Sequence, residues 1–230
     1  MFKQLAAGVA VAVMLAGVAM AGPLEDGEAA FERGDYATAL TLWKPLADKG
    51  DAFARGLLGA MFAAGQGVTQ DYLLAAKWYR LAAEQDNAAA QGDLGSMYEL
   101  GKGVPQNFHE AVRLYGLAAN QGNADAQGSL GAMYARGAGV PQNFTEAAKW
   151  FLLAANRGDA FSQYNLAVSY AKGAGVPQNY VLAHMWWNMA AAQGYKGADK
   201  DRDAVAKLMT PDQIAEAQRL AREWKAKPER

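Results

Sequence analysis

The chain has 230 residues, no cysteine, and 22 Lys and Arg residues against 23 Asp and Glu residues. The lack of cysteine excludes disulfide bonds, thiol catalysis and thiolate metal sites. The nearly neutral charge balance argues against a nucleic-acid partner, which would require a basic surface.

Residues 1–21 have the features of a secretory signal peptide. Lys3 supplies a positive charge, Leu5 to Val18 is an apolar run, and Ala19-Met20-Ala21 is a small-x-small cleavage motif. We expect cleavage before Gly22, a periplasmic or secreted location, and no stable membrane insertion afterwards. The alternative is that the apolar run is retained as a membrane anchor.

Residues 22–50 are expected to form a shortened helix pair that begins the fold. Tyr36 and Trp43 in its second half lie 36 residues before Tyr72 and Tyr79. This spacing keeps the pair in register with the segments that follow it.

Residues 51–194 contain an internal repeat. The segments GQGVTQDY, GKGVPQNF, GAGVPQNF and GAGVPQNY begin at Gly65, Gly101, Gly137 and Gly173, each 36 residues after the previous one. A fixed period of this size predicts stacked repeats rather than a domain with one central active site.

Each repeat is expected to contain two helices joined by a glycine-rich turn. The first helix ends at a left-handed glycine such as Gly101, and the second begins at a capping residue such as Asn107. Glu110 lies three residues after Asn107, as Glu146 does after Asn143, so we predict capping boxes at both places.

The second helix of each repeat carries the pattern expected of packed helices. Small residues allow helices to approach closely, and aromatic residues fill the gaps between them. Because the pattern recurs in every repeat, we interpret the aromatic columns as core rather than as a strip that binds a ligand. The recurring pairs are Ala82-Ala83, Ala118-Ala119, Ala154-Ala155 and Ala190-Ala191, and Trp78-Tyr79, Leu114-Tyr115, Trp150-Phe151 and Trp186-Trp187.

Residues 195–230 depart from the repeat and are expected to form capping helices and a tail. A helix is predicted over 198–208, and a second helix opens with Thr210 as its cap and Gln213 as the capping-box partner. These helices should cover the apolar face of the last repeat.

The pattern A-x-A-Q-x-x-L-G-x-M-Y-x-x-G-x-G-V-P-Q-N-F-x-E-A, from Ala124 to Ala147, resembles the Sel1-like repeat, a relative of the tetratricopeptide repeat. The resemblance covers 51–194 in four copies, after a tetratricopeptide-like half-repeat at 22–50. It implies an all-α, right-handed α-α superhelix of about five helix pairs with a C-terminal capping helix.

The resemblance also implies a function. Exported members mostly act as protein-protein interaction modules, serving as adaptors or regulators in the bacterial envelope or at the host interface. A cysteine-rich branch is linked to hydrolysis of β-lactam or cell-wall compounds, and this is the alternative function. Its hallmark is a disulfide in each repeat, which this chain cannot form.

We predict no catalytic, cofactor-binding or metal-binding residue. The two histidines, His109 and His184, lie 75 residues apart, and neither forms an i, i+4 pair with another metal ligand. No G-x-S-x-G or P-loop motif is present. The chain is therefore expected not to be an enzyme and to need no cofactor.

A partner-binding surface is expected on the concave face, formed by the first helix of each repeat. Helical spacing places mostly small residues and a few charges on this face, which suits an extended peptide or an amphipathic helix. The alternative is that the small residues only allow tight curvature. The candidate residues are Ser96, Glu99, Leu100, Ala132, Arg136, Tyr164, Val168 and Lys172.

Overall fold

A computed structural model describes residues 22–225, so the expected signal peptide lies outside the described residues. Within this range the chain forms twelve α-helices and no strand. The helices are α1 (Pro23–Glu32), α2 (Tyr36–Asp48), α3 (Ala52–Ala64), α4 (Tyr72–Ala83), α5 (Ala88–Leu100), α6 (Phe108–Asn120), α7 (Ala124–Arg136), α8 (Phe144–Ala155), α9 (Ala160–Lys172), α10 (Tyr180–Ala192), α11 (Ala198–Ala206) and α12 (Pro211–Glu223).

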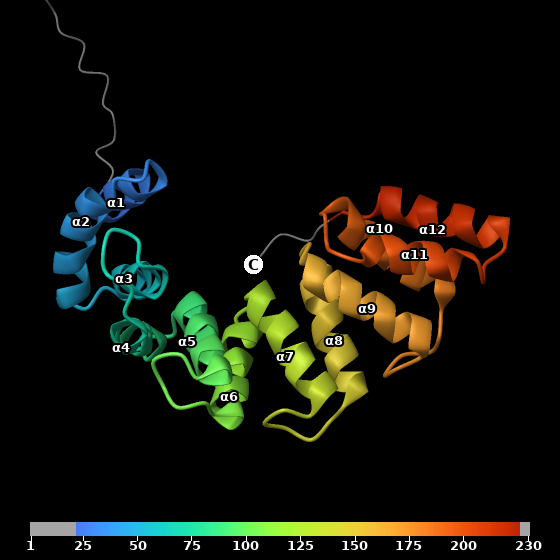
Figure 1. Cartoon of the computed structure of the whole chain (residues 1–230), viewed down its shortest axis with the longest axis horizontal. Helices are drawn as coiled ribbons and strands as arrows, with labels where there is room; N and C mark the ends of the chain where they lie inside the picture. The colour runs from blue at the N-terminus through green and yellow to red at the C-terminus, as the bar shows by residue number, and fades with distance from the viewer. Residues whose placement is uncertain (1–21, 226–230) are drawn as a thin grey trace, which may run out of the picture.

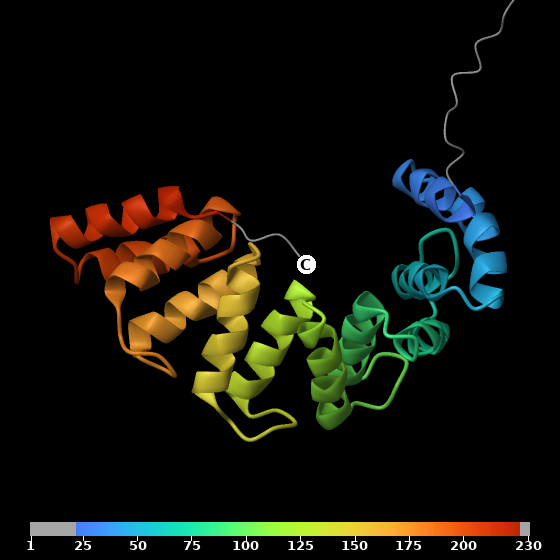
Figure 2. The same cartoon turned by 180° about the vertical axis from the view of Figure 1, so that it is seen from behind.

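Consecutive helices pack against one another along a curved path, so the molecule is an arch with α1 at one end and α12 at the other (Figure 1). Figure 2 shows the same arch from behind. Helices α3 and α5 approach each other across neighbouring repeats, and so do α7 and α9. A closely spaced row belongs on the inside of a curved stack, so α3, α5, α7 and α9 form its concave face.

The ends of the repeat helices follow the expected glycines and caps. Gly65, Gly101, Gly137 and Gly173 all have φ between 68° and 70°, the left-handed conformation that ends the first helix of each repeat. The second helix begins at an Asp or Asn side chain that accepts an amide N–H three residues later.

The predicted capping boxes at Asn107 and Asn143 are wrong. The Asn107 side chain does accept the Glu110 amide, at 3.1 Å, but the Glu110 carboxylate pairs with Arg113 instead of returning to the cap. The reason is that the Asn107 N–H already donates to the Tyr98 carbonyl at 2.9 Å. The Asn143 N–H is bound in the same way, by the Tyr134 carbonyl.

Within each repeat, a small residue on the first helix receives an aromatic ring from the second. A Cβ added at Gly59, Gly95 or Gly131 would lie 2.6–3.0 Å from the ring atoms of Tyr79, Tyr115 or Phe151, respectively. The three aromatic residues are buried, which confirms that this column belongs to the core. Glycine therefore sets how closely the two helices of a repeat pack.

A second glycine in each turn joins neighbouring repeats. Gly103 has φ +67°, and a Cβ at this position would overlap the carbonyl oxygen of Tyr72, which begins α4 of the preceding repeat. Gly139 and Gly175 meet the backbone at Phe108 and Phe144 in the same manner. The turn thus rests directly on the backbone of the previous repeat.

Both ends of the stack are specialised, as expected. Helices α1 and α2 are joined by a turn of only three residues, 33–35, against seven residues, 65–71, between α3 and α4. At the other end, Thr210 and Gln213 form the predicted capping box of α12. The Trp224 ring packs on the Trp186 ring at 6.1 Å, so α12 covers the last repeat. These features confirm the expected all-α solenoid with a C-terminal cap.

A candidate binding groove on the inner face

Two adjoining hollows lie along the inner face of the arch. The first, of about 440 Å³, lies between α3 and α5. Apolar residues such as Ala60, Ala63 and Leu100 line it, and so do Gln66 and Lys102 from the turns. The second, of about 380 Å³, lies between α5 and α7. Asp93 and Ser96 line both, so the two hollows form one continuous depression, which we name the inner groove.

The part of the inner groove between α5 and α7 is acidic. Asp93 and Asp125 line it together with the hydroxyl-bearing residues Ser96, Ser129 and Tyr115. No Lys, Arg or His within residues 22–225 forms an ion pair with either aspartate. This part of the groove therefore presents acceptors and negative charge without a cation of its own.

The environment of Asp93 makes its negative charge unfavourable. Part of the side chain is exposed to solvent, but the surrounding groove displaces enough water to raise the pKa of the carboxyl. The nearby Asp125 carboxylate raises the pKa further, while a hydrogen bond with Tyr79 acts in the opposite direction. A positive group placed between the two aspartates would stabilise both charges.

Glu99 and Arg136, both candidate partner-binding residues, are joined to each other. The Arg136 guanidinium donates to the Glu99 carboxylate at 2.6 Å, and the Tyr115 hydroxyl donates to the same carboxylate at 2.8 Å. The Glu99 side chain is only 19% exposed, against 56% for Arg136. This pair links α5 to α7 across two repeats, and little of the Glu99 charge remains for a partner.

Tyr164 is partly covered by the C-terminal cap. Its hydroxyl donates to the Asp201 carboxylate of α11 at 2.6 Å, and its ring lies 4.9 Å from that of Tyr195. The cap therefore limits access to the inner face at the start of α9.

The other candidate residues fall into three groups. Ser96 and Leu100 line the inner groove, where the Leu100 side chain is 57% exposed. Ala132 and Val168 are partly buried against the core at the C-terminal end of the stack. Lys172 is exposed at the last position of α9.

The groove contains three residues that the sequence analysis did not select: Asp93, Asp125 and Ser129. Asp93 and Ser129 occupy the same repeat position as Leu57 and Asn165. Four different side chains at one position show that stacking does not fix it. That variation was the signal that could have identified this column.

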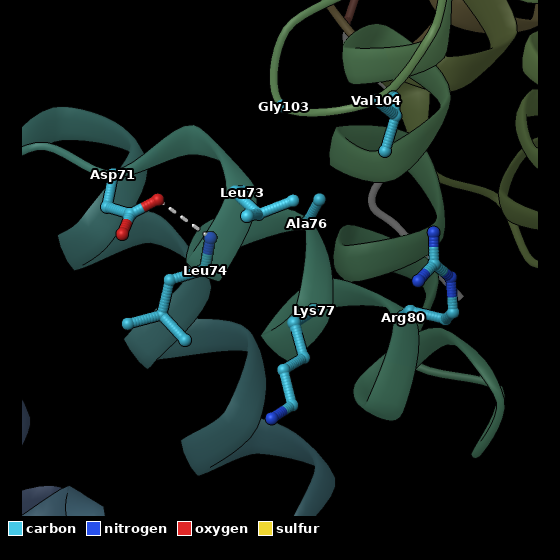
Figure 3. A pocket seen from close by; sticks show the side chains of 8 residues that line it. All are labelled: Asp71, Leu73, Leu74, Ala76, Lys77, Arg80, Gly103 and Val104. Carbon is cyan, nitrogen blue, oxygen red and sulfur yellow. Dashed lines mark hydrogen bonds between the residues drawn. The ribbon is translucent and has the colours of Figure 1, made fainter.

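A separate hollow of about 390 Å³ lies on the outer side of the stack, between α4 and the turn before α6 (Figure 3). Leu73, which is 73% exposed, lines it together with Val104, Lys77 and Arg80. The Asp71 carboxylate faces the Leu74 amide and accepts its hydrogen bond at 2.9 Å. It is therefore used to cap α4.

Several polar groups in or next to this outer hollow are paired within the described part of the protein, although the exposed Lys77 of its lining is not among them. The Arg80 guanidinium donates to the Tyr98 hydroxyl at 3.1 Å, and Glu110 forms an ion pair with Arg113. The inner groove differs in that neither Asp93 nor Asp125 forms an ion pair with a basic side chain within residues 22–225.

The two histidines lie in different settings. His109 is exposed near the start of α6, whereas His184 is buried in α10, and burial lowers the pKa of its imidazole. Among residues 22–225, no group of three or more His, Cys, Asp or Glu side chains could hold a metal ion. No helix in this range is long and apolar enough to cross a membrane.

The repeat architecture of this chain is also found in known proteins. The Sel1 repeat profile matches four consecutive segments, 52–87, 88–123, 124–159 and 160–195, one residue after the boundaries expected from the sequence. No curated protein gives a significant match.

Several solved structures are similar. A Sel1 repeat protein from Oxalobacter formigenes is 29% identical with a TM-score of 0.74, over 85% of this chain and 84% of the other. The protective antigen c5321 of uropathogenic Escherichia coli is 25% identical with a TM-score of 0.59, over 88% and 52%. A putative Sel1 repeat protein from Klebsiella pneumoniae, at 21% identity and a TM-score of 0.54 over 80% and 91%, shares the fold.

Proposed function

Because this chain belongs to the Sel1 repeat family, we propose that it is an exported protein-protein interaction module that binds a protein segment along its inner groove. Sel1 repeat scaffolds generally serve as protein-interaction modules. For this chain, the observation that carries the proposal is the continuity of two hollows through Asp93 and Ser96. A continuous depression suits an extended peptide or a helix better than a small metabolite.

In this proposal the bound segment contacts Ser96 and Leu100 in the groove and continues along the inner row towards α9. Arg136 and Lys172 are exposed at the ends of α7 and α9, where they can contact polar groups of the partner. Ala132 and Val168 supply small apolar surface between them. Glu99 acts by holding Arg136 in place, and Tyr164 marks where the cap limits the site.

Export is part of the proposal, and it rests on residues 1–21, whose charge, apolar run and Ala19-Met20-Ala21 motif match a signal peptide. The similar E. coli chain is a protective antigen, which favours a location outside the cytoplasm. We propose a role as an adaptor or regulator in the envelope or at the host interface. The S-x-x-K spacing at Ser169 and Lys172 does not favour the hydrolase alternative, because the Ser169 hydroxyl is buried and donates to the Asn165 carbonyl at 3.0 Å.

Blocking the groove with a bulky neutral side chain tests this proposal. Ser96→Trp fills the point that both hollows share, and Lys77→Trp places the same side chain in the outer hollow. Each purified variant is immobilised, and the proteins retained from an envelope extract are quantified by mass spectrometry. We expect Ser96→Trp to lose the partner that the unmodified chain retains, and Lys77→Trp to keep it.

Circular dichroism and thermal melting must first show that both variants fold. The opposite result, with capture lost only in Lys77→Trp, would move the binding site to the outer face. Equal capture by both variants would remove the inner groove as the site.

A further inference from the structure

We propose that the segment bound in the inner groove is an extended basic peptide that places a lysine or arginine side chain between Asp93 and Asp125. A neighbouring apolar side chain of the same peptide occupies the hollow between α3 and α5. This inference rests on the proposed function and specifies the chemistry of its partner.

The inner groove is negatively charged between α5 and α7. Asp93 and Asp125 line one hollow, and within residues 22–225 neither is paired with a basic side chain. Both side chains are exposed in the groove, and repulsion by the Asp125 carboxylate helps to raise the pKa of the Asp93 carboxyl. The positive side chain of a partner would neutralise that repulsion and gain charge-assisted hydrogen bonds.

The residues around the two aspartates favour an organic cation over a metal ion. No group of three or more metal-ligating side chains exists among the described residues, so the pair lacks the ligands of a metal site. Ser96 and Ser129 add hydroxyl acceptors to the same hollow. An ammonium or guanidinium group carries several N–H donors and can use acceptors on both sides at once.

The hollow between α3 and α5 can hold the apolar side chain of the peptide. Its apolar lining comes from Ala60, Ala63 and Ala64 of α3 and from Met97 and Leu100 of α5. Lys102 also lines the hollow, and its ammonium group lies over the Tyr72 ring, 5.4 Å from the centroid. The residues of the two helices offer an apolar surface, and the partly exposed Leu100 can close over a bound side chain. Burial of one leucine-sized group there would contribute to affinity without a hydrogen bond.

The spacing of the two hollows sets the spacing of the peptide. Packed helices lie roughly 8–10 Å apart, and an extended chain advances about 3.4 Å per residue. The apolar and basic side chains should therefore be separated by about two to three residues. A helical partner would need a different spacing, because the rise of a helix is only about 1.5 Å per residue.

Selection from a displayed library of random dodecapeptides tests the inference. The purified chain is the bait, and the selected peptides are synthesised and measured by fluorescence anisotropy. We expect a Lys or Arg at a fixed distance from an apolar residue in the selected sequences. The double variant Asp93→Asn with Asp125→Asn should weaken binding by about tenfold or more.

The matched control is Glu28→Gln with Glu32→Gln, which removes two exposed carboxylates from α1 and should change binding by less than about twofold. Replacing the basic residue of the peptide by norleucine should weaken binding to the unmodified chain but have little effect on the double variant. Raising the salt concentration should weaken binding to the unmodified chain more than to the double variant.

The outcomes separate the two proposals. In one outcome, the selected peptides bind the unmodified chain, fail to bind the Ser96→Trp variant, and contain no basic residue. That result would overturn this inference and leave the proposed function standing. Equal affinities of the unmodified chain and the double variant would do the same. If no peptide is selected, or if selected peptides still bind Ser96→Trp, the proposed function and this inference both fail.

Discussion

At the scale of single residues, Gly103 occupies a position that tolerates no side chain. Its φ of +67° is unfavourable for any other residue, by about 1–3 kcal/mol, and a Cβ would also overlap the Tyr72 carbonyl oxygen. We expect Gly103→Ala to lower the free energy of unfolding by more than the φ contribution alone. Gly116, which has no atom near its Cβ position, is the control: Gly116→Ala should raise stability by about 0.5–1 kcal/mol. Urea midpoints that shift in the same direction would contradict this.

The Glu99 carboxylate gives a second prediction at this scale. The buried Tyr115 hydroxyl and the exposed Arg136 guanidinium both donate to it. Glu99→Ala leaves the tyrosine hydroxyl without this acceptor and should lower stability by about 1–3 kcal/mol. Arg136→Ala removes only the exposed partner and should lower it by less than about 1 kcal/mol. Thermal melts of the two variants decide, and equal losses would show that the ion pair, not the tyrosine, controls stability.

At the scale of the helices, α12 has a clear role in covering the end of the stack. Leu220 of this helix and Trp224, which directly follows it, pack against the last core cluster, which includes the buried Trp186. A chain ending at Met209 should lose about 2 kcal/mol or more of stability and bind more of a hydrophobic dye. Arg222→Ala changes an exposed residue of the same helix and should do neither. Equal dye binding by the shortened and full chains would mean that α12 does not protect the core.

The helices also show how far the sequence can be used for prediction. The ends at Gly101 and its equivalents were predictable because they depend on one residue's backbone conformation. The capping box at Asn107 was not, because its amide is bound by the carbonyl of Tyr98, beyond the turn. The box at Thr210 did form, with both hydrogen bonds present.

The candidate site was only partly predictable for a similar reason. Helical spacing placed Ser96 and Leu100 correctly on the inner face, since orientation follows from the position within a single helix. It could not show that Arg136 reaches Glu99 in the preceding repeat, or that α11 contacts Tyr164. Those contacts depend on how separate helices are placed, which the repeat pattern alone does not determine.

At the scale of the whole molecule, the arch predicts a measurable size. A compact domain of about 200 residues would have a radius of gyration of about 17 Å. The helices of this chain instead follow one another along an open curve (Figures 1 and 2). Small-angle X-ray scattering should give a larger radius than that of a compact domain. A value at the compact estimate would show that the arch closes in solution.

The contact of each turn glycine with the backbone of the preceding repeat also constrains how such a chain can evolve. Inserting or deleting a few residues in a turn would move Gly103, Gly139 or Gly175 off the backbone on which it rests. Loss or duplication of a whole 36-residue unit would instead replace one such contact by its equivalent. Recombination between repeats can therefore shorten or lengthen the arch while leaving every junction intact, and the number of repeats can change more readily than their length.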